Sequence, residues 1–294
     1  MTHPISSPKP IHWVHVVHAY GQLFRLSFAG IAAAAGCAAV YALNPALPLS
    51  NYLLTGFILT SMTAAACAIN DYWDIHKDRI NHPERPLPSD RLSLPQAWWA
   101  AALLFASALI AAIPLGGYAF LLVAISTVLL WYYSLLLNYS GILGNFLVAT
   151  IVAFLLLLSS LAADRPFALL YPIGFLFCYA LAREVLWDVH DAEGDRVQGV
   201  VTLANVWGSQ AAFSMIWGLI GVMLVSIPIA TTLLPMGHPL WFAGCAAIML
   251  LTLITALIPY QRQINEANYQ QLVFWERLGM LFGVVGLLGT APSL

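Results

Sequence analysis

The sequence has few charged residues. Only 8% of its 294 residues are Asp, Glu, Lys or Arg, whereas a soluble domain typically has about 25%. Together with a hydrophobic fraction of 61%, this shortage excludes a soluble globular protein and predicts a chain that crosses the membrane several times. The net charge of −2 excludes the basic surface that a nucleic-acid partner would require.

Cysteine is also scarce, with only four in the chain. All four lie in apolar stretches without paired or metal-type spacing, so we interpret them as small core or lipid-facing residues. The segment before Tyr20 lacks the pattern of a signal peptide, and no low-complexity linker divides the chain. We therefore expect one domain, residues 1–294, in which residues 1–21 form a cytoplasmic arm or an interfacial helix.

Apolar stretches of about 20 residues, the length that spans a bilayer as a helix, recur along the chain. They predict an all-α, multi-pass membrane bundle of about nine transmembrane helices. The expected spans are 22–43, 51–70, 96–114, 118–138, 142–162, 167–187, 210–234, 239–260 and 272–290.

The basic residues predict how the chain is oriented. Most of them fall in or beside the N-terminal arm and the loops after the second, fourth, sixth and eighth spans, and only Arg165 falls in a loop on the other side. Because Lys and Arg concentrate in cytoplasmic loops, we expect a cytoplasmic N-terminus. The expected location is the plasma (inner) membrane, with the active site facing the cytoplasm.

Two acidic runs contain seven of the thirteen carboxylates in the chain. They cover residues 70–78 and 188–195, and each has aspartates at positions i, i+3 and i+7. On a helix these positions share one face. The runs follow the second and sixth spans, which are separated by an even number of crossings. Both runs should therefore emerge on the same, cytoplasmic side and meet across one cavity mouth.

Six aspartates directed at one place require a counter-charge, because each costs about 2.5–3.5 kcal/mol at membrane depth. Oxygen-only ligands suit Mg²⁺, which usually shares its ligand shell with phosphate oxygens. Bound ions could grip a diphosphate and stabilise it as a C–O bond breaks. An apolar bundle beneath them could hold a hydrocarbon tail, so the pattern indicates an isoprenyl diphosphate substrate.

Two other interpretations of the acidic runs remain open. The aspartates could cap helices and solvate loops, although an acid near a helix C-terminus opposes the macrodipole. The chain could instead be an ion or proton transporter, which also has acids within the membrane. Against transport, the acids gather at one face, and no matched pair of broken short helices appears in the two halves.

Three histidines, His12, His15 and His18, recur every third residue in the N-terminal segment. They could bind a metal ion. We favour an amphipathic helix on the membrane surface, because no carboxylate or cysteine lies near them.

Both runs resemble known signatures. Residues 70–78 have the form N-D-x-x-D-x-x-x-D, followed by R-I-N-H-P-E-R-P-L-P-S. Residues 183–199 contain R-E, then D-x-x-D-x-E-G-D-R-x-x-G. These segments resemble the two aspartate-rich signatures of the UbiA superfamily of intramembrane prenyltransferases. They are most similar to the members that act on geranylgeranylglyceryl phosphate, with chlorophyll-synthase-like members also near. The pair Tyr133-Ser134 and the segment 141–145 are similar to a weaker mid-chain signature.

The resemblance implies nine helices around a central cavity, Mg²⁺ as cofactor, an isoprenyl diphosphate donor and a lipophilic acceptor. It implies a transferase that moves a prenyl group within the membrane, among membrane lipids. The metal ligands it implies are Asn70, Asp74, Asp78, Asp191 and Asp195. The candidate catalytic residues are Asp71, Asp74, Asp78, Asp188, Asp191 and Asp195. The candidate diphosphate-binding residues are Lys77, Arg79, Arg85, Arg25 and Tyr133, and Arg85 could close over the site.

The sequence departs from the family pattern at several polar positions. Leu137 and Asn138 stand where the family often has Lys-Arg, and Val201 stands where it often has Lys. The asparagine that often follows in the first helix is also missing after Arg25. An acceptor with its own phosphate would miss these groups most. The losses also leave room for a terpene cyclase, which would act on the prenyl diphosphate without an acceptor.

Overall fold

The computed structural model describes residues 13–137 and 141–290, and for residues 134–137 it describes the backbone alone. Within this part of the chain the only regular structure is helical. The nine long helices are α2 (Leu26–Leu43), α3 (Leu49–Trp73), α5 (Leu94–Ala112), α6 (Gly117–Leu137), α7 (Ile142–Ala162), α8 (Leu170–His190), α10 (Leu203–Leu233), α11 (Pro239–Arg262) and α12 (Glu266–Leu287). The shorter ones are α1 (Trp13–Leu23), α4 (Ile75–Asn81), α9 (Ala192–Val197), η1 (Ile113–Leu115) and η2 (Leu288–Thr290).

The predicted all-α membrane bundle is confirmed. Among the described residues, 8 helices are long and apolar enough to cross a membrane. The remaining long helix, α6, is apolar over Gly117–Tyr133. The eight spanning helices together with α6 therefore agree approximately with the nine crossings that the apolar stretches predict.

The predicted boundaries are wrong at three places that matter for the site. The first helix starts at Leu26 rather than at residue 22, because Arg25 has a left-handed backbone (φ 45°, ψ 52°) that separates it from α1. The second and sixth helices run on to Trp73 and His190, so that each includes the first aspartate of its acidic run. The seventh begins at Leu203, before a kink at Gly208.

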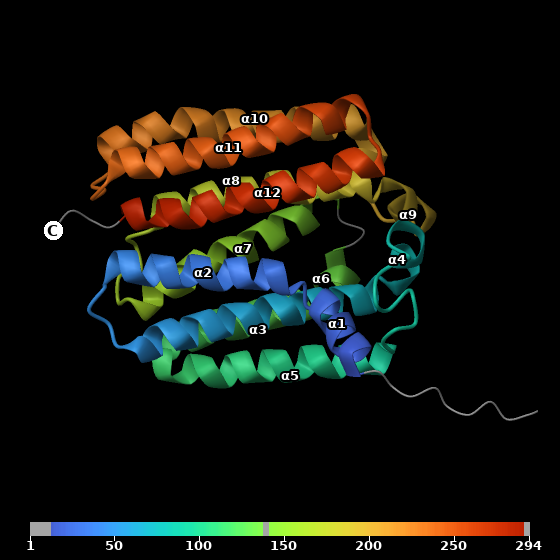
Figure 1. Cartoon of the computed structure of the whole chain (residues 1–294), viewed down its shortest axis with the longest axis horizontal. Helices are drawn as coiled ribbons and strands as arrows, with labels where there is room; N and C mark the ends of the chain where they lie inside the picture. The colour runs from blue at the N-terminus through green and yellow to red at the C-terminus, as the bar shows by residue number, and fades with distance from the viewer. Residues whose placement is uncertain (1–12, 138–140, 291–294) are drawn as a thin grey trace, which may run out of the picture.

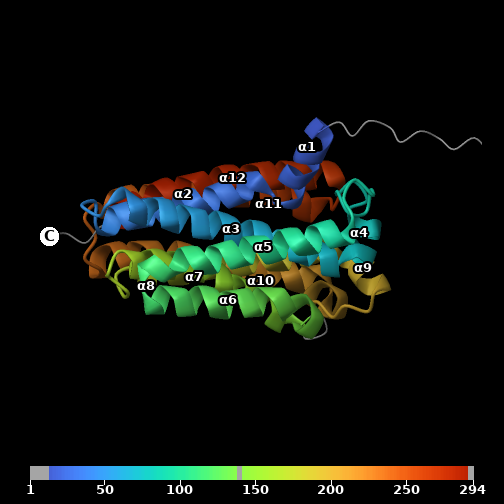
Figure 2. The same ribbon diagram turned by 90° about the horizontal axis from the view of Figure 1, so that it is seen from below.

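The helices lie side by side in two groups (Figure 1). One group contains α3, α5 and α6, and the other contains α8, α10, α11 and α12. Helices α2 and α7 lie between them: α2 contacts α3 and α12, and α7 contacts α6 and α8. The view from below shows α1, α4 and α9 at one end of the bundle (Figure 2). The end of α12 lies at the opposite end.

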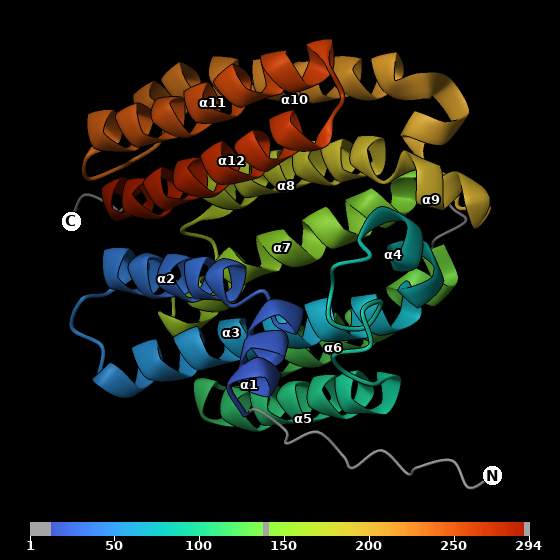
Figure 3. The same cartoon turned by 45° about the vertical axis from the view of Figure 1, so that its right-hand side comes forward.

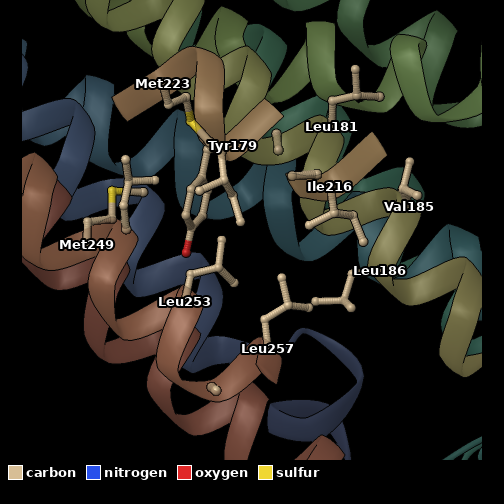
Figure 4. Close-up of a cluster of buried hydrophobic side chains, with 14 of the residues drawn as sticks. Tyr179, Leu181, Val185, Leu186, Ile216, Met223, Met249, Leu253 and Leu257 are labelled. Atoms are coloured by element: carbon tan, nitrogen blue, oxygen red, sulfur yellow. The ribbon is translucent and has the colours of Figure 1, made fainter. Parts of the chain in front are cut away.

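The second group is held together by close apolar packing. Tyr179 and Leu186 of α8, Ile216 of α10, and Leu253 and Leu257 of α11 are almost completely buried there (Figure 4). In a membrane the lipid is as apolar as these side chains, so van der Waals fit, rather than exclusion of water, makes the association specific.

Small residues bring α11 and α12 into close contact. A Cβ added at Gly279 would lie 2.3 Å from Oγ1 of Thr252, and one at Gly283 would lie 2.7 Å from Sδ of Met249. Close approach through small residues is a common way in which membrane helices associate. This contact fixes α12, which lines the cavity described below.

Candidate functional site

Each acidic run breaks its helix at the middle aspartate. Asp74 (φ −91°, ψ 12°) separates α3 from α4, and Asp191 (φ −87°, ψ 4°) separates α8 from α9. The expectation that each run forms one face of one helix is therefore wrong. The backbone of both middle aspartates lies in the bridge region of φ/ψ space, so the regular helix ends there. The third aspartate of each run, Asp78 or Asp195, consequently lies on a short second helix.

The two short helices contact each other at the same end of the bundle (Figure 3). Nδ2 of Asn81 donates a hydrogen bond to the main-chain oxygen of Asp191 at 2.9 Å, and Oδ1 of Asn81 accepts one from the amide of Gly194 at 2.9 Å. A Cβ at Gly194 would lie 2.5 Å from Nδ2 of Asn81, so the fit requires glycine. The structure thus brings the two runs together, although they are more than a hundred residues apart.

A cavity of about 370 Å³ lies between the runs and the bundle interior. Carboxylates of both runs line it, and so does Asn70. The lining aspartates are Asp74, Asp78, Asp188, Asp191 and Asp195. Away from the runs most of the wall is apolar, and it includes Ile58, Leu59, Met62, Val123, Ile151 and Leu158. The cavity therefore combines an acidic mouth with an apolar interior.

Lys77 connects the two acidic runs. Its Nζ lies 3.1 Å from Oδ2 of Asp74 and 3.4 Å from Oδ1 of Asp195. Burial alone would lower the pKa of Lys77, but the two carboxylates raise it above its usual value. The ammonium group of Lys77 is therefore protonated at neutral pH.

Two arginines contact the first run. Nη1 of Arg85 lies 2.8 Å from both carboxylate oxygens of Asp78 and 3.6 Å from Oδ1 of Asp71. Nη2 of Arg25 lies 2.9 Å from the same oxygen of Asp71. Asp71 does not line the cavity. It instead holds two guanidinium groups that do.

The cavity lining, over the described residues, has excess negative charge. Seven carboxylates line the cavity, the five aspartates with Glu184 and Glu276, against five basic groups, Arg25, Lys77, Arg85, Arg183 and Arg277. Burial raises the pKa of Asp78 and of Asp195 to about 6. Crowded carboxylates with raised pKa values are the environment that an added cation stabilises.

Residues of the weak mid-chain signature support the two runs in matching ways. The hydroxyl of Tyr133 on α6 donates a hydrogen bond to Oδ1 of Asn70. Nδ2 of Asn145 on α7 donates one to Oδ2 of Asp188 at 2.7 Å. Each run is therefore oriented at its first polar residues by a side chain of a neighbouring helix.

Comparison with known proteins identifies the chain's relatives. The model of the UbiA prenyltransferase family matches residues 29–278. The chain belongs to this family. The resemblance seen in the two aspartate runs is thus confirmed, and the protein is a prenyltransferase of the UbiA type.

Two curated relatives share the name digeranylgeranylglyceryl phosphate synthase. The protein from Sulfolobus acidocaldarius is 34% identical over 179 residues, which is 60% of this chain and 65% of that protein. The protein from Ignicoccus hospitalis is 31% identical over 236 residues, or 78% of this chain and 77% of that one.

A solved structure shows the same fold. It is a UbiA homologue from Archaeoglobus fulgidus bound to GPP and Mg²⁺, with a TM-score of 0.68. The match has 15% sequence identity and covers 92% of this chain and 99% of the other.

Four of the five predicted diphosphate-binding residues line the cavity, and one does not. Lys77, Arg85, Arg25 and Tyr133 all line the cavity. Arg79 does not line it, and its side chain is exposed to solvent. The turn of α4 that directs Lys77 inward directs Arg79 outward, so the structure does not bring Arg79 to the cavity with the others, and its role at the diphosphate stays a prediction.

The positions that depart from the family pattern are only partly visible. Val201 lines the cavity, so an apolar side chain occupies this part of its wall. The side chain of Leu137 and the whole of Asn138 lie outside the described residues.

Sequence reasoning missed a deeper pair of charges. Nε of Arg183 lies 2.9 Å from Oε1 of Glu276, and both residues line the cavity. The guanidinium carbon of Arg183 lies 4.3 Å from the ring centre of Phe28. A signal was present, because an acid within the apolar span 272–290 is expensive and commonly marks a functional site.

The two described histidines of the N-terminal segment do not line the cavity. His15 and His18 are exposed on α1, and His12 lies outside the described residues. The exposed Trp13, Val14 and Val17 on the same helix agree with the expected interfacial location.

The donor set at the mouth fits Mg²⁺. It consists of carboxylate and amide oxygens, which Mg²⁺ prefers. Oδ1 of Asp195 is buried without a hydrogen-bond partner among the described residues, and Lys77 approaches it only to 3.4 Å. A buried carboxylate oxygen without a hydrogen-bond donor is available to a cation.

Proposed function

We propose that this UbiA-family protein transfers a prenyl group from an isoprenyl diphosphate to a lipophilic acceptor, with Mg²⁺ as cofactor. The observation that carries the proposal is the acidic mouth above an apolar chamber in one cavity. A diphosphate with bound cations matches the mouth, and a hydrocarbon chain matches the interior. The related synthases and the GPP- and Mg²⁺-bound homologue support this assignment.

In this proposal Asn70, Asp74, Asp78, Asp191 and Asp195 hold the metal. Mg²⁺ would neutralise the diphosphate and stabilise the negative charge that develops on it. Asp71 and Asp188 position other groups: Asp71 holds Arg25 and Arg85, and Asp188 is fixed by Asn145.

The cationic side chains act on the leaving group. Lys77 and Arg85 lie beside the carboxylates that would bind the metal, so both can donate hydrogen bonds to diphosphate oxygens in the same space. When the allylic C–O bond breaks, its electron pair goes to the diphosphate, and these donors stabilise the added charge. The acceptor nucleophile then forms a bond to the prenyl carbon and loses its proton. The apolar wall excludes water, which would otherwise capture the allylic cation.

The site faces the cytoplasm in this proposal, in the plasma membrane. The basic residues concentrate near the mouth, and α1 lies at the same end of the bundle (Figure 2). Single cysteines at Ser89 and Gln198, both exposed, test this in a cysteine-free background. An impermeant thiol reagent should label neither in intact cells and both in opened membranes. Labelling of either from outside contradicts the orientation.

The activity is tested with purified protein and a panel of labelled prenyl diphosphates, with and without acceptors. The panel should include glyceryl phosphate lipids and lipophilic alcohols or phenols without phosphate, because Val201 makes part of the wall apolar. Product that needs both Mg²⁺ and an acceptor supports the proposal. Product without an acceptor indicates a cyclase, and full turnover in excess EDTA contradicts the metal role.

A further inference from the structure

A second cluster of metal-binding side chains lies beside the cavity mouth. His82, His190 and Asp191 each offer one ligand atom, and these atoms all lie within 4.8 Å of one another. Two imidazoles and one carboxylate are a different donor set from the oxygen ligands of the mouth, and imidazole suits zinc and similar metals rather than Mg²⁺. We propose that these three residues bind a divalent transition metal ion of the zinc class.

The distances are close to those that such an ion requires. Nε2 of His82 lies 3.0 Å from Oδ1 of Asp191, and the ring centres of His82 and His190 are 5.6 Å apart. Bonds of about 2.0–2.2 Å from zinc to nitrogen or oxygen place neighbouring ligand atoms about 3.3–3.6 Å apart. The three ligand atoms, all within 4.8 Å of one another, therefore need to move by only about 1 Å to surround such an ion.

The surroundings fix the ligands in place. The ring of His190 stacks on Tyr269, with centres 3.4 Å apart and planes within 2°. The main-chain oxygen of Asp191 is held by Asn81. A carboxylate oxygen of Glu84 lies 3.9 Å from Nδ1 of His82, the ring nitrogen that does not face Asp191. At 3.9 Å this carboxylate makes no hydrogen bond to the ring, but it adds negative charge beside the site, which favours a bound cation.

An ion can reach the cluster. The side chains of His82, His190 and Asp191 are 9%, 13% and 22% exposed, so the site is mostly enclosed but open to solvent on one side. That opening leaves a coordination position for water, since the protein supplies three ligands and zinc usually takes four.

The site would link the two acidic runs outside the Mg²⁺ position. His82 ends α4, whereas His190 and Asp191 end α8. Oδ1 of Asp191 faces His82, which leaves Oδ2 for the cavity, so one carboxylate can serve both sites. The ion would also fix the start of the loop that carries Arg85.

A cobalt titration of the full-length, untagged protein tests the proposal, because bound Co²⁺ is visible by its absorption and Zn²⁺ displaces it. Millimolar Mg²⁺ is present throughout to occupy the oxygen site. We expect one tight equivalent in the unaltered chain, and at least a tenfold weaker affinity in His82→Gln and in His190→Gln. His76→Gln is the matched control. His76 is exposed on α4 and lies outside the cluster, so this variant should bind Co²⁺ as the unaltered chain does.

A second variant identifies the ligand directly. In His190→Cys, bound Co²⁺ should show a thiolate-to-cobalt charge-transfer band that the unaltered chain lacks. Unchanged affinity in both glutamine variants, or absence of the band in a folded His190→Cys protein, overturns the proposal. So does loss of cobalt binding in Asp74→Asn while the histidine variants still bind. The titration needs no substrate, so its outcome is independent of whether the chain transfers prenyl groups.

Discussion

The substitution Lys77→Met tests whether Lys77, and not the neighbouring cation Arg79, binds the leaving diphosphate. Lys77 and Arg79 are two residues apart in the first acidic run, but only Lys77 lines the cavity. Its Nζ lies 3.1 Å from Asp74 and 3.4 Å from Asp195, whereas Arg79 is exposed. If Lys77 donates a charge-assisted hydrogen bond to the leaving diphosphate, its loss costs about 1.5–3 kcal/mol. That corresponds to a decrease of about 10- to 150-fold in kcat/KM for the donor.

The same substitution has a second expected effect, on stability. Without the ammonium group, Asp74 and Asp195 face each other with no shared counter-charge, so the metal-free protein should unfold at a lower temperature. Added Mg²⁺ should recover most of this loss, because the ion supplies the missing charge. Thermal unfolding in detergent, with and without Mg²⁺, measures the difference.

Arg79→Met is the matched control, since it removes one positive charge from the same short helix. We expect kcat/KM within about twofold of the unaltered chain, because exposed charges contribute little. The reasoning is refuted if both variants lose activity equally, since a general surface charge would then explain the effect. It is also refuted if Lys77→Met keeps full activity.

Two further predictions follow from the packing and from the metal site. Asp74→Ala and Asp191→Ala should each lower the turnover by more than tenfold, because each removes a metal ligand. Membrane fractionation should show that both variants still insert in the membrane. If both variants retain more than a tenth of the activity, the metal role is contradicted. Gly279→Ala should lower the midpoint of thermal unfolding, because the added methyl group would lie 2.3 Å from Oγ1 of Thr252 at the contact of α11 with α12. Gly244→Ala is the control, because no atom lies within 4 Å of the added methyl group there. Equal midpoints for the two variants contradict the packing.

The fold was predictable because hydrophobic length determines which segments cross a bilayer. The apolar stretch 142–162 coincides with α7, and the long helices follow the other stretches closely. The helix breaks at Asp74 and Asp191 were not predictable, since the contact through Asn81 and Gly194 joins residues 113 positions apart. The spacing of residues along the chain does not predict a contact between segments so far apart.

The site was predictable in its acids but less so in its cations. Carboxylates are rare in this chain, so two runs with one spacing stand out, and five of their six aspartates line the cavity. Lys77 and Arg79 are indistinguishable until the turn of α4 is known. The acid in the apolar span 272–290 marks Glu276 as unusual, but its pairing with Arg183 was not predictable, because Arg183 comes from a different helix.

The two acidic runs act together if they form one metal–diphosphate site. A double-mutant cycle with Asp74→Asn and Asp195→Asn, measured as kcat/KM for the donor in saturating Mg²⁺, tests it. Residues that act as a unit are strongly non-additive, so the double variant should be within about tenfold of the worse single variant. If the two losses multiply instead, the aspartates act independently and the single metal–diphosphate site is contradicted.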